Sequence, residues 1–307
     1  MPKKIKLKIK KKKKMNFNSI VFPAPTDNKY PNIEKYKNEI IYIPKTLPDS
    51  TQFHIPCLFH EYKNTETNKI FIYFHGNAED MFNAIGNLTV IQSQLPFHTL
   101  SVEYPGYSIY YKEKDAETIE NDSLIIFDYL VEKWKVKPKN IILCGRSIGT
   151  GPATYLASKR SPGALIMISP IQSIQDAANS LIGFMKFIVK DRFNNYERIK
   201  DVTCPLLLIH GQKDSLISFE KSIQLTERTG GPYELILPEN MNHNDVNLYD
   251  DFLEPISKFL KNHNLVNVDK GEIYIDHSLF EIPEYLKKGE WNNMDKTSEF
   301  VRKLLKI

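Results

Sequence analysis

The chain has 307 residues, of which 41% are hydrophobic and 25% charged, the proportions of an ordinary folded protein with a sizeable core. Its formal charge of +4 depends on nine lysines between Lys3 and Lys14, and without them 32 basic residues face 37 acidic ones. This slightly acidic body excludes nucleic acid as the expected partner. Only three cysteines are present, without metal-ligand spacing, so we expect buried free thiols and neither a metal nor a cofactor: Cys57, Cys144 and Cys204.

Residues 1–16 form a basic tail that we expect to be disordered, because like charges at this density repel one another. Lys3 to Lys14 have three readings: contact with an anionic membrane surface, a nuclear-localisation or nucleic-acid patch, or a solvated extension before a start at Met15. No run approaches the roughly 18 apolar residues of a membrane span, and a secretory signal core is missing. The sequence predicts a cytoplasmic protein, with peripheral contact at a membrane surface as an added expectation.

Short β-like runs separated by Pro and Asn/Asp clusters come first and predict an antiparallel meander, at 19–22, 40–43 and 54–62. From Ile70 onward strands alternate with helices, which indicates right-handed crossovers and a largely parallel sheet. The expected strands of this part are 70–74, 98–103, 141–144, 165–168, 206–209 and 233–237. The expected helices are 78–95, 115–135, 148–158, 219–228 and 246–260.

We predict a single domain over residues 17–264, an α/β fold with a doubly wound sheet and helices on both faces. Residues 170–202 interrupt the alternation and predict a lid-like insertion. Its apolar side chains, among them Phe184 and Phe187, either line an apolar acyl site or cover the core. Residues 265–307 form a C-terminal extension of unassigned role, with a strand-like run at 272–275 and an amphipathic helix near 296–305.

The stretch Gly145-Arg146-Ser147-Ile148-Gly149 follows an apolar strand and begins a helix. Gly-x-Ser-x-Gly in that setting is typical of the nucleophile elbow of α/β hydrolases, a strained turn that projects the serine Oγ above the sheet. The N–H groups after the serine lie at the positive end of a helix. Because the pentapeptide alone is common, the interpretation depends on partners at neighbouring strand ends.

Two such partners follow later strands: Asp214 comes after 206–209 and His243 after 233–237. The order Ser147, Asp214, His243 is that of α/β hydrolases, and the carboxyl ends of parallel strands are where open sheets build their sites. His243 would take the serine proton, and Asp214 would fix the imidazole tautomer. The rival acids begin the last helix, where carboxylates are stabilising: Asp245, Asp250 and Asp251.

The predicted oxyanion hole consists of the N–H groups of Ile148 and Asn77, the latter following His75-Gly76 at a strand end. His75 and His210 precede glycines and are expected to stabilise turns. Arg146 has two readings, steering of an acidic or acyl-bearing substrate or plain solvation.

As a set, these motifs resemble those of the α/β-hydrolase-domain-containing proteins of subfamily seventeen and their thirteen-type, Bem46-like relatives. The resemblance runs from about Val21 to Leu260 and rests on residues 21–25, 74–78, 104–107, 145–151, 210–214 and 243–245. It implies an α/β-hydrolase fold with a mostly parallel sheet of the eight-stranded type, a serine hydrolase and, for seventeen-type members, a palmitoyl-protein thioesterase at membranes. Those members have a cysteine-rich, palmitoylated N-terminus, whereas residues 1–16 contain no Cys, so the lysine run is the expected electrostatic substitute.

We therefore predict a serine hydrolase that acts through an acyl-enzyme on long-chain acyl thioesters of protein cysteines. A carboxylesterase or lipase acting on small or lipid esters would use the same triad and is the first alternative. The second alternative is a non-catalytic hydrolase-fold scaffold recruited to membranes by its basic tail. The expected partner is an acylated protein, lipid or ester substrate.

Overall fold

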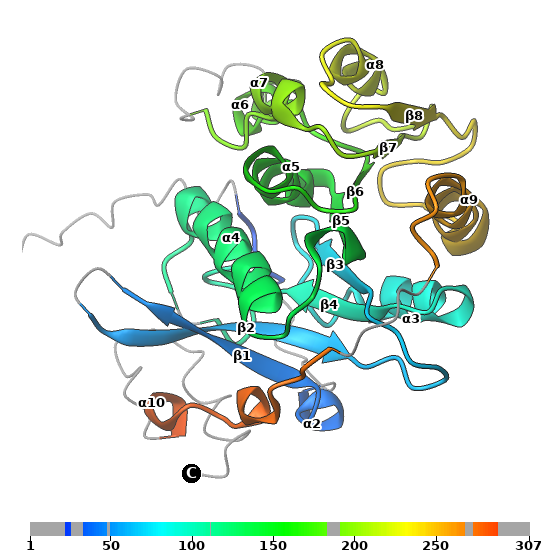
Figure 1. Cartoon of the computed structure of the whole chain (residues 1–307). Coiled ribbons are helices and arrows are strands. Elements are labelled where there is room, and N and C mark those ends of the chain that lie inside the picture. Colours follow the sequence, from blue (N-terminus) through cyan, green and yellow to red (C-terminus); the bar gives the residue numbers. More distant parts are fainter. Residues whose placement is uncertain are drawn as a thin grey trace, which may run out of the picture.

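An eight-stranded sheet with the order β1-β2-β4-β3-β5-β6-β7-β8 runs through the molecule (Figure 1). The computed structural model describes residues 22–25, 33–47, 50–110, 112–182, 191–267 and 273–287. The strands are β1 (Ile40–Thr46), β2 (Gln52–His60), β3 (Ile70–Phe74), β4 (His98–Val102), β5 (Ile141–Arg146), β6 (Ala164–Ile168), β7 (Leu206–Ile209) and β8 (Tyr233–Ile236).

Strand β2 runs antiparallel to both of its neighbours, β1 and β4. Every pairing from β4 through β8 is parallel. Strands β3, β4, β6 and β7 are buried along their whole length. Burial on both faces explains why β3, β6 and β7 read as continuous apolar runs, whereas the buried strand β4 also carries His98, Thr99 and Ser101. The predicted mostly parallel sheet of the eight-stranded type is confirmed.

The helices fall into a longer and a shorter group. The longer ones are α3 (Ile85–Gln94), α4 (Ala116–Glu132), α5 (Thr150–Lys159), α6 (Ile174–Ile182), α8 (Glu220–Thr226) and α9 (Glu254–Asn262). The short ones are α2 (Ile33–Tyr36), α7 (Asn195–Arg198), α10 (Glu284–Lys287), the 3-10 turns η1 (Pro138–Asn140), η2 (Ser147–Gly149), η4 (Ile199–Asp201) and η6 (His277–Phe280), and the π-helical η5 (Leu248–Leu253).

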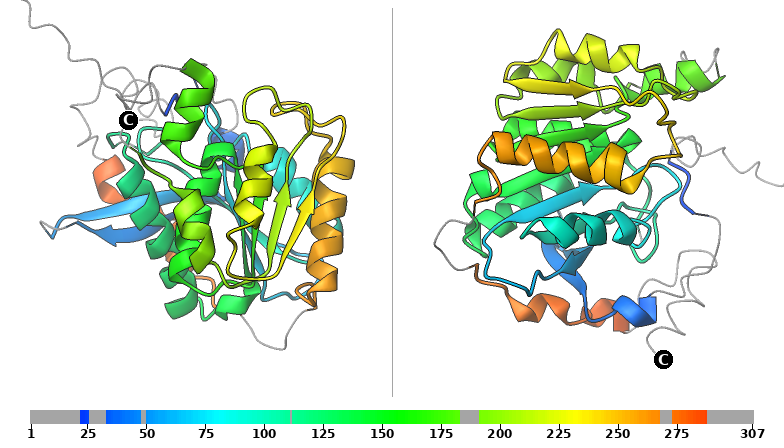
Figure 2. Two further views of the ribbon diagram at one scale, coloured as in Figure 1. Left: turned by 90° about the horizontal axis from the view of Figure 1, so that it is seen from above. Right: turned by 90° about the vertical axis from the view of Figure 1, so that its right-hand side faces the viewer.

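Alternate residues of each central strand belong to opposite faces of the sheet. Ile72 of β3 lies in one hydrophobic cluster with residues of α4 and α5. Its neighbour Phe71 lies in a second cluster with residues of α3 and α9. Figure 2 shows α9 and α3 lying across one face of the sheet. The two clusters confirm the predicted placement of helices on both faces.

The predicted helix over 78–95 begins seven residues late, at Ile85. The Asp80 carboxylate accepts the N–H groups of Phe82 and Asn83, and the Asn83 side chain accepts the N–H of Asp80. Such local side-chain bonds offer the backbone an alternative to the helical ladder. Residues 77–84 therefore remain a sequence of turns, and Ala78 has a positive φ of 57°.

The expected last helix, 246–260, begins instead as the π-helical η5 and continues as α9. Asn247 caps it, because its side-chain oxygen accepts the N–H groups of Tyr249 and Asp250. The expected strand over 272–275 is wrong in its described part, since residues 273–276 are irregular. The expected helix near 296–305, the run at 19–21 and the basic tail lie outside the described residues.

Residues 273–287 lie along the antiparallel edge of the sheet, where Leu286 joins a hydrophobic cluster with Ile40 and Leu58. The three cysteines are buried and free, as expected. Within the described ranges, no helix combines the length and apolar character needed to cross a bilayer.

Candidate active site

Ser147 lies in the tight turn that joins β5 to α5. Its φ is +53°, and its side chain is almost buried, with 8% of the residue exposed. The turn requires glycine on both sides: a Cβ on Gly145 would lie 2.5 Å from the Gly149 oxygen, and one on Gly149 would overlap the Phe74 carbonyl oxygen. Backbone strain of this kind at a polar residue is a mark of functional sites.

Three loops bring Ser147, His243 and Asp214 into one hydrogen-bonded chain. His243 Nε2 lies 3.0 Å from Ser147 Oγ, and His243 Nδ1 lies 2.7 Å from Asp214 Oδ2. Because an ionised carboxylate only accepts, Nδ1 carries the hydrogen and Nε2 is left to accept from the serine hydroxyl. That tautomer is the one a general base for Ser147 needs.

Asp214 is the most heavily bonded member of the chain. Its Oδ2 also lies 3.1 Å from His210 Nε2, and its Oδ1 accepts the N–H groups of Leu216 and Ile217, each at 2.9 Å. Burial raises the pKa of this carboxyl, but hydrogen bonds from His210, His243 and Ile217 outweigh it and hold the pKa well below its usual range. Asp214 is therefore held as an anion facing His243.

His210 contacts the same Asp214 oxygen as His243. Its Nε2 is 2.9 Å from the carbonyl oxygen of Ile217, which only accepts, so Nε2 carries the hydrogen. Its Nδ1 lies 2.7 Å from Ser222 Oγ on α8. The expected role of His210 in a turn thus extends to orienting the acid.

The turn after β3 carries Asn77, one of the two predicted oxyanion donors. The Gly76 carbonyl lies 2.9 Å from His75 Nδ1, while the N–H groups of Gly76 and Ala78 donate to Glu79 Oε2 and the Pro23 carbonyl. The Gly76 carbonyl and the Asn77 N–H belong to one trans peptide and point in opposite directions. His75 therefore sets the direction of the Asn77 N–H. The other predicted donor, Ile148, directly follows Ser147 in η2 and is 6% exposed.

Behind this turn lies a buried pair that the sequence did not point out, His75 and Glu103, whose Nε2 and Oε1 are 3.2 Å apart with both side chains 0% exposed. Burial raises the pKa of Glu103. For His75 burial works against the charged form, but the bond to Glu103 prevails and raises the pKa of the imidazole. The ring of Tyr104 lies against His75 with the centroids 3.9 Å apart and the planes tilted by 31°. The one available signal was the position of Glu103, just past the carboxyl end of a parallel strand.

Arg146 fits neither reading proposed from sequence. Its side chain is 13% exposed and forms an ion pair with Glu79. Its Nη2 donates to the His243 carbonyl at 2.7 Å and to Asn244 Oδ1 at 3.2 Å. The guanidinium is therefore held within the protein rather than solvated or directed at a substrate.

Of the three rival acids, Asp245 was expected to begin the last helix but lies in the irregular segment before η5. Asp250 and Asp251 bond to the side chain and backbone of Asn247 at the start of η5, as expected for carboxylates at a helix N-terminus. In the described part of the chain, no group of three or more His, Cys, Asp and Glu side chains is arranged to hold a metal ion.

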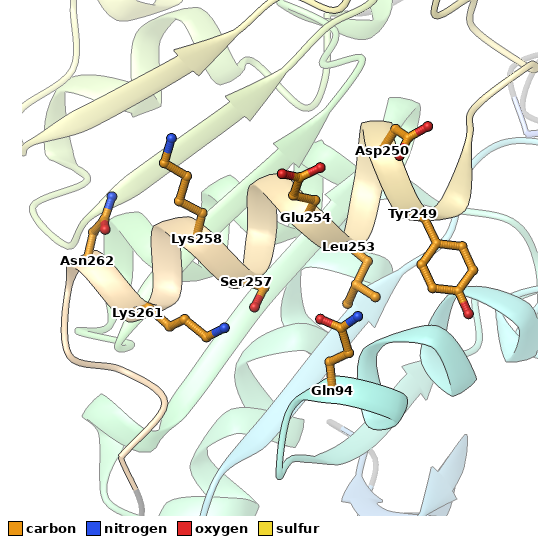
Figure 3. A pocket seen from close by; sticks show the side chains of 9 residues that line it. All are labelled: Gln94, Tyr249, Asp250, Leu253, Glu254, Ser257, Lys258, Lys261 and Asn262. Atoms are coloured by element: carbon orange, nitrogen blue, oxygen red, sulfur yellow. The ribbon is translucent and has the colours of Figure 1, made fainter.

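A hollow of about 520 Å³ lies on the surface beside α9 (Figure 3). It is lined by α9, η5 and Gln94 of α3, and none of its lining residues belongs to the Ser147 cluster. The proposed lid is described only to Ile182 and again from residue 191, so Phe184 and Phe187 lie outside the described residues.

The eight-stranded sheet, the single antiparallel strand inside it and the elbow after β5 define an α/β hydrolase. Solved structures agree on the fold. The esterase Pf2001 of Pyrococcus furiosus superposes with a TM-score of 0.61 at 16% identity, covering 79% of this chain and 97% of that one. An α/β hydrolase from Vibrio vulnificus gives 0.60 at 16% identity, covering 80% and 90%.

Relatives in sequence indicate which family of α/β hydrolases the chain resembles. Human α/β hydrolase domain-containing protein 17B is 31% identical over 197 residues, which are 64% of this chain and 67% of that protein. Mouse protein 17C is 32% identical over 196 residues, 64% of this chain and 60% of the relative. A scan against protein-family models finds no match. The chain belongs to the α/β hydrolase domain-containing protein 17 family, which confirms the resemblance read from the motifs.

Proposed function

We propose that this protein is a serine hydrolase that works through an acyl-enzyme. The observation that carries the proposal is the continuous hydrogen-bonded chain from Ser147 through His243 to Asp214, built on a strained turn. A serine hydroxyl is a weak nucleophile at neutral pH and needs an adjacent, oriented base. The 3.0 Å separation of His243 Nε2 and Ser147 Oγ meets that need.

In the proposed reaction Ser147 Oγ attacks the acyl carbonyl carbon while its proton moves to His243 Nε2. The N–H groups of Asn77 and Ile148 hold the negative oxygen of the tetrahedral intermediate, a contribution of about 3–4 kcal/mol for each such donor. His243 then gives the proton to the leaving group, and the acyl group stays on Ser147. Water, activated by His243, releases the fatty acid by the same steps in reverse order.

The substrate class we propose is a long-chain acyl thioester on a protein cysteine, the class implied by the resemblance to seventeen-type proteins. A thiol has a pKa of about 8.5, so it leaves with little help from a general acid. We place the protein in the cytoplasm, with Lys3 to Lys14 at an anionic membrane surface. That tail lies outside the described residues, and vesicle binding by a chain lacking residues 1–14 tests its role.

A carboxylesterase is the second candidate, favoured by the esterase among the structural neighbours. The hydrogen-bonded chain from Ser147 through His243 to Asp214 argues against the non-catalytic scaffold, because a scaffold does not need a base oriented toward a strained serine.

The deciding experiment compares kcat/KM for a palmitoylated cysteine peptide and a short p-nitrophenyl ester, in the full chain and in Ser147→Ala. We expect higher kcat/KM on the thioester and loss of both activities in the variant. A preference for the short ester would establish the carboxylesterase instead. A folded wild-type chain that turns over neither substrate and takes no fluorophosphonate label on Ser147 would favour the scaffold.

A further inference from the structure

Arg146 occupies the variable position of the elbow, directly before the proposed nucleophile. Its guanidinium reaches two other segments of the site. Nη1 pairs with the Glu79 carboxylate, and Nη2 donates to the His243 carbonyl at 2.7 Å and to Asn244 Oδ1 at 3.2 Å. One side chain thus joins the segment that carries Ser147 to the segment that carries His243.

Glu79 extends this connection to the turn after β3, which carries Asn77. Its second oxygen, Oε2, accepts the Gly76 N–H at 2.8 Å. The pair lies close over Gly76, because a Cβ there would be 3.0 Å from Arg146 Nη1 and 3.3 Å from Glu79 Oε2. A path of hydrogen bonds therefore runs from the Gly76 N–H through Glu79 and Arg146 to the His243 backbone.

Arg146 is itself well fixed. It is the last residue of β5, paired with Ile168 of β6, and its backbone continues straight into Ser147. A planar guanidinium has several donors in a fixed fork, so it can hold two partners at a set separation. The side chains are 13% and 27% exposed, which shields the pair from much of the solvent.

We propose that Arg146 and Glu79 are positioning residues that hold the Asn77 turn and the His243 loop in register with Ser147. The inference rests on the proposed function, since it assigns these residues to the same reaction. Neither side chain is required to touch the acyl chain. Their loss should therefore lower kcat while leaving KM nearly unchanged, the signature of interactions that matter in the transition state.

The test measures kcat, KM and urea unfolding for the full chain carrying Arg146→Met, Glu79→Gln and both together. Misplacement of a reacting group by about 1 Å costs about 100-fold, so we expect Arg146→Met to lower kcat by about 100-fold with KM within about twofold. The double variant should lose little more than Arg146→Met alone, because the two residues act through one path. Arg146→Lys should recover part of the rate, since an ammonium still donates to Glu79.

The matched control is Arg160→Met, which removes another arginine–carboxylate pair, Arg160 with Asp128 at 2.6 Å, between α5 and α4. It should leave kcat unchanged. The inference is overturned if folded Arg146→Met and Glu79→Gln keep kcat within twofold of the wild type, or if the loss lies in KM alone. A wild-type chain without Ser147-dependent turnover would instead overturn the proposed function, and the inference with it.

Discussion

Two imidazoles and two backbone N–H groups converge on the single carboxylate of Asp214. These four hydrogen-bond donors stabilise the ionised carboxylate of Asp214 and fix its orientation, although its side chain is buried. His243 and His210 approach the same oxygen, so the acid that orients the proposed base is itself oriented by a second histidine. A site built this way has little freedom for the imidazole to rotate away from Ser147.

Stability should depend on pH through Asp214. Its folded-state pKa is lowered from an unfolded value of about 3.9. The stabilisation is therefore complete above about pH 4 and is lost as the pH falls from there toward the lowered value. Urea unfolding of the wild type and Asp214→Asn, measured from pH 7 to pH 3, should show a difference that shrinks below about pH 4.

The same variant should lose about 10⁴-fold in kcat, because an amide no longer enforces the Nδ1–H tautomer of His243. A difference in unfolding free energy that stays constant down to pH 3 would show that the ionised form of Asp214 is not what stabilises the fold.

The residues of the hydrogen-bonded chain could be predicted because each follows a recognisable strand in a known order. Glu79, Glu103 and the true contacts of Arg146 could not. Glu79 accepts the Gly76 N–H, and Glu103 pairs with the buried side chain of His75. Hydrophobic periodicity does not predict contacts of this kind, which depend on the shape of individual turns.

At the scale of elements, the elbow depends on the close approach of η2 to the end of β3. A Cβ added at Gly149 would overlap the carbonyl oxygens of Phe74 and His75, whereas one added at Gly86 in α3 would have nothing within 4 Å. Gly149→Ala should therefore lower the free energy of unfolding by about 1–3 kcal/mol through overpacking. Gly86→Ala should raise it by about 0.5–1 kcal/mol, because alanine favours the helix.

Urea unfolding of the two variants beside the wild type checks this contrast. Equal changes in the free energy of unfolding at both positions would contradict the close packing of Gly149 in the strand-to-helix turn.

The strands of the parallel sheet were predicted within two residues, and the bounds of β3 and β7 agree in full, since continuous apolar runs leave little choice of position. The helix over 78–95 was predicted too long, because apolar periodicity continued through a segment where Asp80 and Asn83 bind the backbone instead. The π-helical start of the last helix was equally invisible to a 3.6-residue pattern.

Across the whole molecule, residues far apart in sequence meet because β3, β5, β7 and β8 end at one edge of the sheet. Parallel pairing alone makes this convergence predictable. The packing of residues 273–287 beside β1 and β2 was not predictable, since their strand-like run at 272–275 forms no strand in its described part and they bury only scattered side chains such as Leu279 and Leu286.

The central claim is that Ser147 is a nucleophile activated by His243. Labelling the full chain with a fluorophosphonate and locating the adduct by mass spectrometry tests it most directly. We predict a single adduct on Ser147, prevented by excess palmitoyl thioester and absent from Ser147→Ala. A folded wild-type chain that forms no adduct, or forms it on another residue, would contradict the account.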